Sequence, residues 1–247
     1  MSTNLVRADL TVEVCRVLAS AGDPERAVGQ QRYMKSVMPY YGITSAELKR
    51  LLRSLLADPA FALTSEEEWQ ATVKALWDNA THREERYAAQ ALLGHRRYAA
   101  WLRPPTMPLI RHLIITGAWW DHVDDLASHH VGSILRRDRG ATTPVLQQWA
   151  VAAGDGAMWL RRTAIIAQLG HKADTDLALL TEAIDANLET TAEGERTAFG
   201  REFFIRKAIG WALRQHAYVD PDWVRDFVAE REARLSGLSR REALKHL

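Results

Sequence analysis

The sequence predicts an all-α protein, an α-α superhelix (solenoid) of HEAT-like repeats with a concave face. No segment alternates apolar and polar residues with the period of two that a half-buried strand shows, whereas helix start signals recur from end to end. Similar short segments also recur at a spacing that suits a pair of helices. With 247 residues, 47% of them hydrophobic and 26% charged, the chain can bury a substantial core.

Capping signals place two helices in the first third of the chain. Thr44 or Ser45 caps a run that extends through Leu55. Further on, Thr64-Ser65 followed by three glutamates forms a capping box that leads into Trp69. Each signal predicts the start of one helix.

Prolines predict the starts of further segments. Pro24, Pro105, Pro144 and Pro221 are each expected near a helix start, where the missing N–H costs no hydrogen bond. The polar run 188–196 predicts an enlarged loop. We expect about a dozen helices joined by short loops. They would form a single domain over residues 1–247, because no linker rich in glycine and proline divides the chain.

Equivalent segments set the register of the repeats. Segments that begin at Arg86, Asp124 and Arg162 start 38 residues apart, and one at Arg206 follows after 44. Helix pairs of this length stack because they cannot bury their faces alone. On the concave side the three arginines would form a cationic track for phosphates, with Asp124 as a carboxylate inside it. The alternative is an interhelix ion pair between Asp124 and Arg162.

The segment from Trp119 to Asp125 is the strongest functional signal. Two adjacent indoles precede three carboxylates, a combination without an obvious packing role. Trp120 and Asp124 are four residues apart and share one helix face. An aromatic wall beside a fixed negative charge suits a substrate that carries positive charge.

Composition narrows the class of protein. The formal net charge is +1, from 32 basic and 31 acidic residues, so the net charge does not by itself indicate a nucleic-acid partner. One cysteine, Cys15, excludes an internal disulfide and a cysteine-based zinc cluster. There is no apolar run long enough for a membrane span, and the polar residues 1–4 lack the order of a secretory signal. We expect a cytoplasmic monomer without metal or cofactor.

Several separated motifs resemble the AlkD-type DNA alkylation repair family, bacterial DNA glycosylases built from HEAT-like repeats. They are Gln31 to Lys35 with Gly42-Ile43, Ile115 to Asp124, Trp159 to Ile165, Glu202 to Trp211, and Ser239 to Ala243. The resemblance spans nearly the whole chain. It departs at Ala118, at His122 and in the expanded loop before Glu202.

The resemblance implies a role for each matching residue. Asp124 would be the catalytic carboxylate, Trp120 and Trp211 the aromatic walls around the lesion's sugar, and Arg162 a residue that holds the DNA backbone. The substrate would be double-stranded DNA with N3- or N7-alkylated purines, and family members act without swinging the base into a deep pocket. Candidate DNA contacts from the motifs and basic clusters are Tyr33, Lys35, Arg86, Phe204, Arg206, Lys207 and Arg214.

The chemistry of such a lesion matches these residue types. An N3- or N7-alkylpurine is already cationic, so it leaves as a neutral base without a general acid, and the sugar keeps the positive charge. One carboxylate can stabilise that charge and position a water. Two other functions stay open: a repeat protein that binds damaged or branched DNA without cleaving it, and a protein-interaction scaffold.

Overall fold

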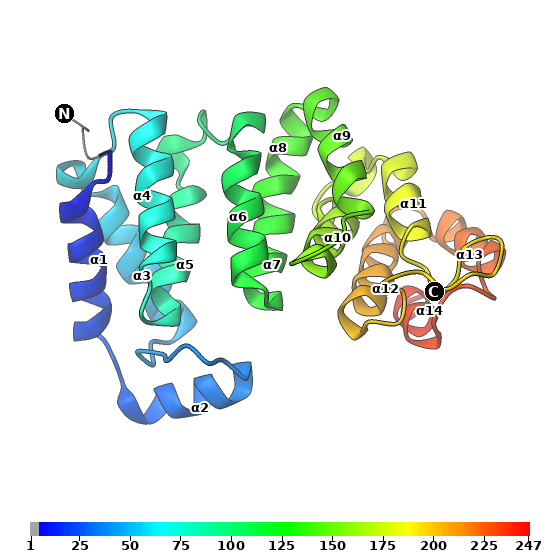
Figure 1. The fold of residues 1–247 in the computed structure, drawn as a ribbon, viewed down its shortest axis with the longest axis horizontal. Coiled ribbons are helices and arrows are strands. Elements are labelled where there is room, and N and C mark those ends of the chain that lie inside the picture. The colour runs from blue at the N-terminus through cyan, green and yellow to red at the C-terminus, as the bar shows by residue number, and fades with distance from the viewer. Residues whose placement is uncertain (1–4) are drawn as a thin grey trace. The chain divides into compact units, whose positions relative to one another are not determined.

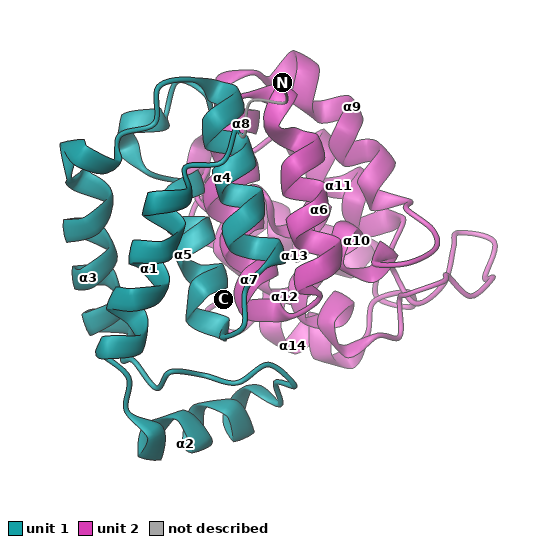
Figure 2. Ribbon diagram, turned by 60° about the vertical axis from the view of Figure 1, so that its left-hand side comes forward, with its two compact units in different colours: residues 1–102 teal, residues 103–247 magenta. Residues whose placement is uncertain are grey.

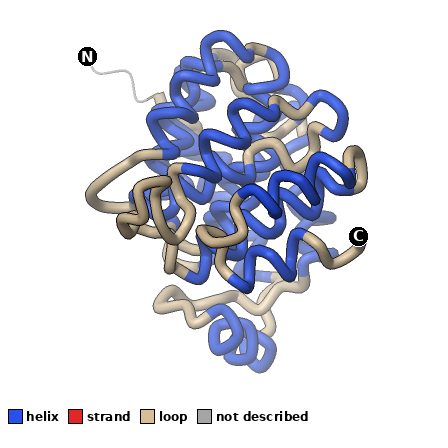
Figure 3. Tube along the Cα trace, turned by 90° about the vertical axis from the view of Figure 1, so that its right-hand side faces the viewer, coloured by secondary structure: helices blue, strands red, loops and turns tan. Residues whose placement is uncertain are grey.

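The structure, a computed structural model, describes residues 5–247, which form helices and connecting loops (Figure 3). The all-α prediction is therefore confirmed for this range. Residues 1–4, on which the expectation of no secretory signal rests, lie outside the described range. Contacts between Cα atoms divide the chain into two compact units, residues 1–102 and 103–247 (Figure 2). Within the described range no helix is long and apolar enough to cross a membrane.

The first unit is a bundle of four α-helices with a fifth beside it. Helix α1 packs against α3, α4 and α5, and α4 packs against α5, whereas α2 lies off one end of the bundle (Figure 1). Thr44 caps α3 by accepting from the N–H of Glu47, and Ser65 caps α4 by accepting from Glu68, as the capping signals predicted. The α-helices are α1 (Ala8–Ser20), α2 (Pro24–Met34), α3 (Ser45–Ala57), α4 (Glu66–Asp78) and α5 (Arg83–Leu93).

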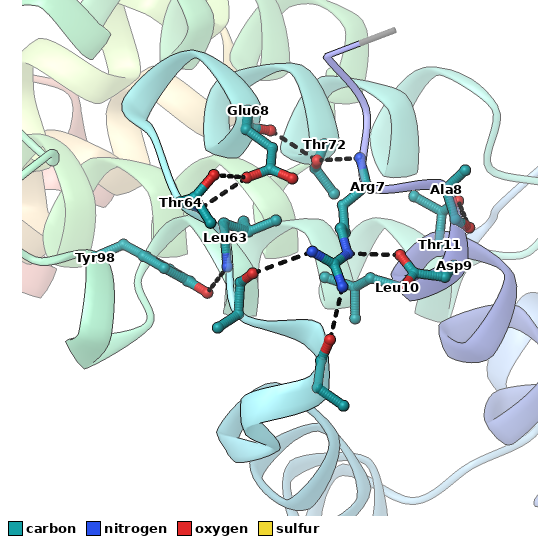
Figure 4. A network of polar contacts seen from close by, with 12 residues as sticks. Arg7, Ala8, Asp9, Leu10, Thr11, Leu63, Thr64, Glu68, Thr72 and Tyr98 are labelled. Carbon is teal, nitrogen blue, oxygen red and sulfur yellow. Dashed lines mark hydrogen bonds and ion pairs between the residues drawn. The ribbon is translucent and has the colours of Figure 1, made fainter.

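Hydrogen bonds from Arg7 tie the start of α1 to the segment before α4 (Figure 4). The guanidinium donates to the carboxylate of Asp9 at 2.7 Å and to the carbonyl oxygen of Ala60 at 2.7 Å. The Arg7 backbone N–H donates to Thr72 Oγ1 on α4 at 3.0 Å. The bundle is thus closed by polar contacts at this end as well as by its apolar core.

The second unit consists of α-helices that follow one another in pairs. They are α6 (Met107–Gly117), α7 (Trp120–Asp125), α8 (Gly132–Arg137), α9 (Arg139–Ala150), α10 (Ala157–Ile166), α11 (Leu177–Asp185), α12 (Phe203–Ala217), α13 (Pro221–Glu230) and α14 (Gly237–Ala243). Helix α10 packs between α7 and α12, and α12 packs against α14, while α9 packs against α10 and α11. Successive pairs therefore stack through their second helices, as the repeat spacing predicted.

Helices α7 and α8 are one continuous helix with a π-helical stretch, Leu126–Val131, between them. The helix comes very close to the end of α10: a Cβ at Gly132 would lie 2.4 Å from the carbonyl oxygen of Ala167. His171 Nε2 lies 2.9 Å from the Gly132 carbonyl oxygen and must donate, because a carbonyl only accepts. These contacts fix the helix that carries Asp124 against the helix that carries Arg162.

Three of the four proline predictions are confirmed and one is wrong. Pro24 and Pro221 begin α2 and α13, and Pro105 lies in a short 3-10 helix just before α6. Pro144 instead lies inside α9, which begins at Arg139 behind an Asp138 cap. As the sixth residue of α9, Pro144 has no N–H to donate to the carbonyl oxygen of Gly140, so the helix lacks one hydrogen bond there. The run 188–196 is a loop, as predicted, with one isolated bridge between Thr190 and Arg196.

Ala118 links α6 to α7 in a left-handed backbone conformation, with φ 40° and ψ 38°. A residue with a Cβ is strained in this region, by roughly 1–2 kcal/mol, whereas glycine is not. We therefore expect Ala118→Gly to raise the free energy of unfolding by about 0.5–1 kcal/mol. Chemical denaturation checks this, with Ala178→Gly on the exposed side of α11 as the control. At this position, in the first turn of α11, the same change relieves no left-handed strain and should lower stability by up to about 1 kcal/mol. A loss of stability at both positions would contradict the account.

Candidate active site

The segment from Trp119 to Asp125, with its two indoles and three carboxylates, begins directly after the left-handed turn at Ala118. Trp119 has an extended backbone and precedes the first residue of α7, Trp120. Asp124 follows one turn later, and its own carbonyl accepts a hydrogen bond from Ser128 Oγ at 2.7 Å. The sequence prediction that Trp120 and Asp124 occupy one helix is confirmed.

Asp124 and Arg162 form a two-pronged ion pair between α7 and α10. Arg162 Nε donates to Oδ1 at 2.7 Å and Nη2 donates to Oδ2 at 2.8 Å. The third guanidinium nitrogen, Nη1, donates to the carbonyl oxygen of Phe204 at the start of α12, at 2.5 Å. The Arg162 side chain is 4% exposed and that of Asp124 is 17% exposed. The interhelix pair considered as an alternative is therefore present, and Arg162 bonds to protein rather than facing outward.

Burial and the ion pair act in opposite directions on Asp124. Burial raises the pKa of the Asp124 carboxyl above its usual value, whereas the bonds from Arg162 lower it and the nearby Asp121 raises it again. Burial has the larger effect, so the net direction is upward. A carboxylate with a raised pKa is a stronger base toward a bound water.

An aromatic cluster lies beside the Arg162 end of this pair. Phe204 lies with its ring centroid 4.9 Å from that of Trp159 and 5.6 Å from that of Trp119. The Arg162 guanidinium carbon is 5.8 Å from the Phe204 ring centroid. Phe203, beside Phe204, is 53% exposed. The second unit thus builds an aromatic cluster of Trp119, Trp159, Phe203 and Phe204 from the starts of α7, α10 and α12.

The sequence prediction named other aromatic residues as the walls of the site. Trp120 and Trp211 are both half-buried, the first on α7 and the second on α12. Neither belongs to the aromatic cluster around Arg162. Trp119 and Trp159 do, although the sequence prediction gave them no role. Both lie within motifs that carry the family resemblance, Ile115 to Asp124 and Trp159 to Ile165, and that was the available signal.

The predicted DNA contacts on α12 differ in their surroundings. Phe204 belongs to the aromatic cluster. Arg206 is half-buried, and its Nε donates no hydrogen bond among the described residues. Lys207 Nζ lies 2.7 Å from Glu242 Oε1, and Arg214 donates to Oε2 of the same carboxylate. Two of these cations therefore have a protein partner.

The predicted DNA contacts of the first unit lie on two helices. Tyr33 is 77% exposed near the end of α2, and Lys35 follows it in a left-handed conformation. Arg86 on α5 is half-buried with its guanidinium carbon 4.9 Å from the Trp77 ring centroid. Burial, followed by repulsion from Arg83, lowers the pKa of Arg86. Arg86 is therefore engaged by its own unit, while Tyr33 and Lys35 face outward.

Asp125, next to the candidate catalytic residue, has different partners. His129 Nδ1 lies 2.9 Å from its Oδ1, and His130 Nε2 lies 3.4 Å from its Oδ2. Although burial acts to raise it, these histidines hold the pKa of Asp125 well below the usual value. Among the residues that the structure describes, no group of three or more His, Cys, Asp or Glu side chains is arranged to hold a metal ion. Asp124 and Asp125 are thus adjacent carboxylates in distinct environments.

Comparison with known proteins agrees with the resemblance drawn from the motifs. A family model described as DNA alkylation repair enzyme matches residues 14–247. Among solved structures, one described as a predicted DNA alkylation repair enzyme from Enterococcus faecalis is similar, with 29% sequence identity and a TM-score of 0.76. The match covers 92% of this chain and 96% of that one. No curated protein matches the chain significantly.

Proposed function

Because the chain belongs to the family of DNA alkylation repair enzymes, we propose that it is a DNA glycosylase that releases cationic N3- or N7-alkylpurines from duplex DNA. Asp124 would stabilise the sugar cation and position the attacking water. The observation that carries the proposal is the partly exposed Asp124 carboxylate, which is fixed by Arg162, the residue whose guanidinium lies beside the Phe204 ring. Alkylation repair is the family's role, and the glycosylase chemistry is our proposal.

The geometry around Asp124 supports a positioning role for Arg162 instead of the backbone contact expected from sequence. The guanidinium takes one acceptor position on each carboxylate oxygen, and an ionised carboxylate has about four such positions. A water can therefore still bind the exposed edge of Asp124. Because Arg162 is also bonded to Phe204, it holds the carboxylate at a set angle.

Electrostatic energy supports a carboxylate as the main catalytic group. At about 4 Å and an effective dielectric of about 20, a charge pair is worth about 4 kcal/mol. Only the part gained in the transition state lowers the barrier, and each ~1.4 kcal/mol of it changes the rate tenfold. Trp120 and Trp211, if they face the lesion as the resemblance implies, would each add about 0.5–2 kcal/mol for a cationic base. Normal purines are neutral, so they gain little from the carboxylate or from the tryptophan rings.

The same ion pair favours a second candidate function. Arg162 offsets the negative charge of Asp124, so a sugar cation would meet a dipole rather than a free anion. A protein that binds damaged or branched DNA without cleaving it would keep this pair as an interhelix contact. Both functions predict duplex binding, and only the first predicts release of a base.

Release of free base separates the two candidates. Purified protein is incubated with duplex DNA that carries 7-methylguanine, in the presence of a metal chelator, and the free base is counted. We expect release in single turnovers and none from undamaged duplex. Duplex binding without any release, for both 7-methylguanine and 3-methyladenine, would support the non-catalytic function instead.

A further inference from the structure

Glu242 on α14 holds two of the cations that were predicted to bind DNA. Its Oε1 lies 2.7 Å from Lys207 Nζ, and its Oε2 accepts a hydrogen bond from Arg214 Nη1. Lys207 and Arg214 are seven residues apart on α12 and so occupy one helix face. One carboxylate thus bridges two cations two turns apart.

The packing of α14 on α12 fixes this carboxylate in place. A Cβ at Gly210, between the two cations on α12, would lie 2.5 Å from the Cβ of Glu242, so only glycine permits this approach. Ser239, one turn before Glu242, donates to the carbonyl oxygen of Arg206 at 2.9 Å. The position of Glu242 along α12 is therefore set by buried contacts.

The bridge leaves both cations partly accessible. The side chains of Lys207 and Arg214 are 40% and 23% exposed, and that of Glu242 is 17% exposed. The hydrogen bond from Lys207, and then the charges of Lys207, Arg214 and Lys245, outweigh burial and lower the pKa of Glu242. The carboxylate is ionised at neutral pH, and it occupies donors that a phosphate oxygen would otherwise take.

We propose that Glu242 is a specificity-determining residue that limits the duplex affinity of this face, by competing with DNA phosphates for Lys207 and Arg214. The inference rests on the proposed DNA-binding function. A phosphate oxygen that binds either cation must displace or share the carboxylate. Contacts to phosphate carry no sequence or lesion information. Weakening them therefore reduces binding to the many undamaged sites that compete with a lesion.

Salt-dependent binding of undamaged duplex DNA tests this proposal. Fluorescence anisotropy at several KCl concentrations gives the slope of log affinity against log salt. For Glu242→Gln we expect binding several-fold tighter, and a slope more negative by about 0.9 for each cation that gains a phosphate. Adding Lys207→Gln to the Glu242→Gln variant should reverse part of this change in slope. Lys207→Gln made in the wild-type protein should change the slope less, because Glu242 already occupies Lys207 there.

Glu232→Gln is the matched control, because it removes the same charge from an exposed ion pair with Arg240 on the same α14. Its slope should stay close to that of the wild type. Equal slopes for the two variants, or weaker binding by folded Glu242→Gln, would overturn the proposal. Should Glu242→Gln fail to fold, the test is Lys207→Gln in the wild-type protein. A slope less negative by about 0.9 would then overturn the proposal, because Lys207 would already be bound to a phosphate in the presence of Glu242. Absence of duplex binding by wild type and variant alike would refute the proposed DNA-binding function as well.

Discussion

Asp124→Asn is expected to lower the single-turnover rate of 7-methylguanine release by a factor on the order of 10²–10³, the usual loss when one preorganised electrostatic group is removed. The amide is neutral and cannot offset the charge that grows on the sugar. Duplex affinity should stay near the wild-type value, because the proposed phosphate contacts come from cations and not from Asp124. Rate and affinity are measured on the same DNA.

Asp125→Asn is the matched control for this variant. The change is chemically identical and one residue away, but Asp125 is held by His129 and His130 instead of Arg162. It should keep most of the excision rate. Equal losses for the two variants, with both proteins folded by circular dichroism, would remove Asp124 from its assigned role.

Arg162→Gln is expected to lower the free energy of unfolding by about 3–5 kcal/mol at neutral pH, because it leaves a mostly buried carboxylate without its cation. Without Arg162, burial and then the nearby Asp121 charge act unopposed on the Asp124 carboxyl and raise its pKa further. A folded-state pKa above the unfolded value means that the carboxyl favours the folded state at low pH and loses that contribution as pH rises through the folded pKa. The deficit relative to wild type should therefore shrink toward acid pH. Urea denaturation at pH 7 and pH 4 measures it.

Arg225→Gln provides the control, since its ion pair with Asp222 on α13 is exposed and worth at most about 1 kcal/mol. It should cost little at either pH. A deficit for Arg162→Gln as small as that of Arg225→Gln would contradict the buried pair. A deficit that grows toward acid pH would contradict the assigned effect of burial on Asp124.

The fold follows from local signals that the sequence carries strongly. Thr44 and Ser65 cap helices where predicted, since a cap needs only the next three residues. The recurring spacing also placed Asp124, Arg162 and Arg206 on successive stacked helices. Pro144 was misplaced because α9 begins earlier, at a cap the proline does not specify. The left-handed turn at Ala118 gave no signal, because alanine is rare there.

The partners within the site were harder to predict from the sequence. The repeat register brought Asp124 and Arg162 together, but register alone does not say whether an arginine faces DNA or a neighbouring carboxylate. That choice depends on the Phe204 carbonyl, which supplies the third acceptor for Arg162. Glu242 was recognised only as part of a motif, because its contact with α12 depends on close packing at Gly210.

The pH dependence of single-turnover 7-methylguanine release by the wild-type protein tests the central claim most directly. If ionised Asp124 drives release of an already cationic base, the rate should rise with pH through one acid limb. The midpoint should lie above the ordinary aspartate pKa of about 3.9, and the rate should then stay level. A decline on the alkaline side below pH 9 that is absent from the uncatalysed release of 7-methylguanine from the same DNA would indicate a required general acid. That result, or an acid limb that persists unchanged in Asp124→Asn, would contradict the account.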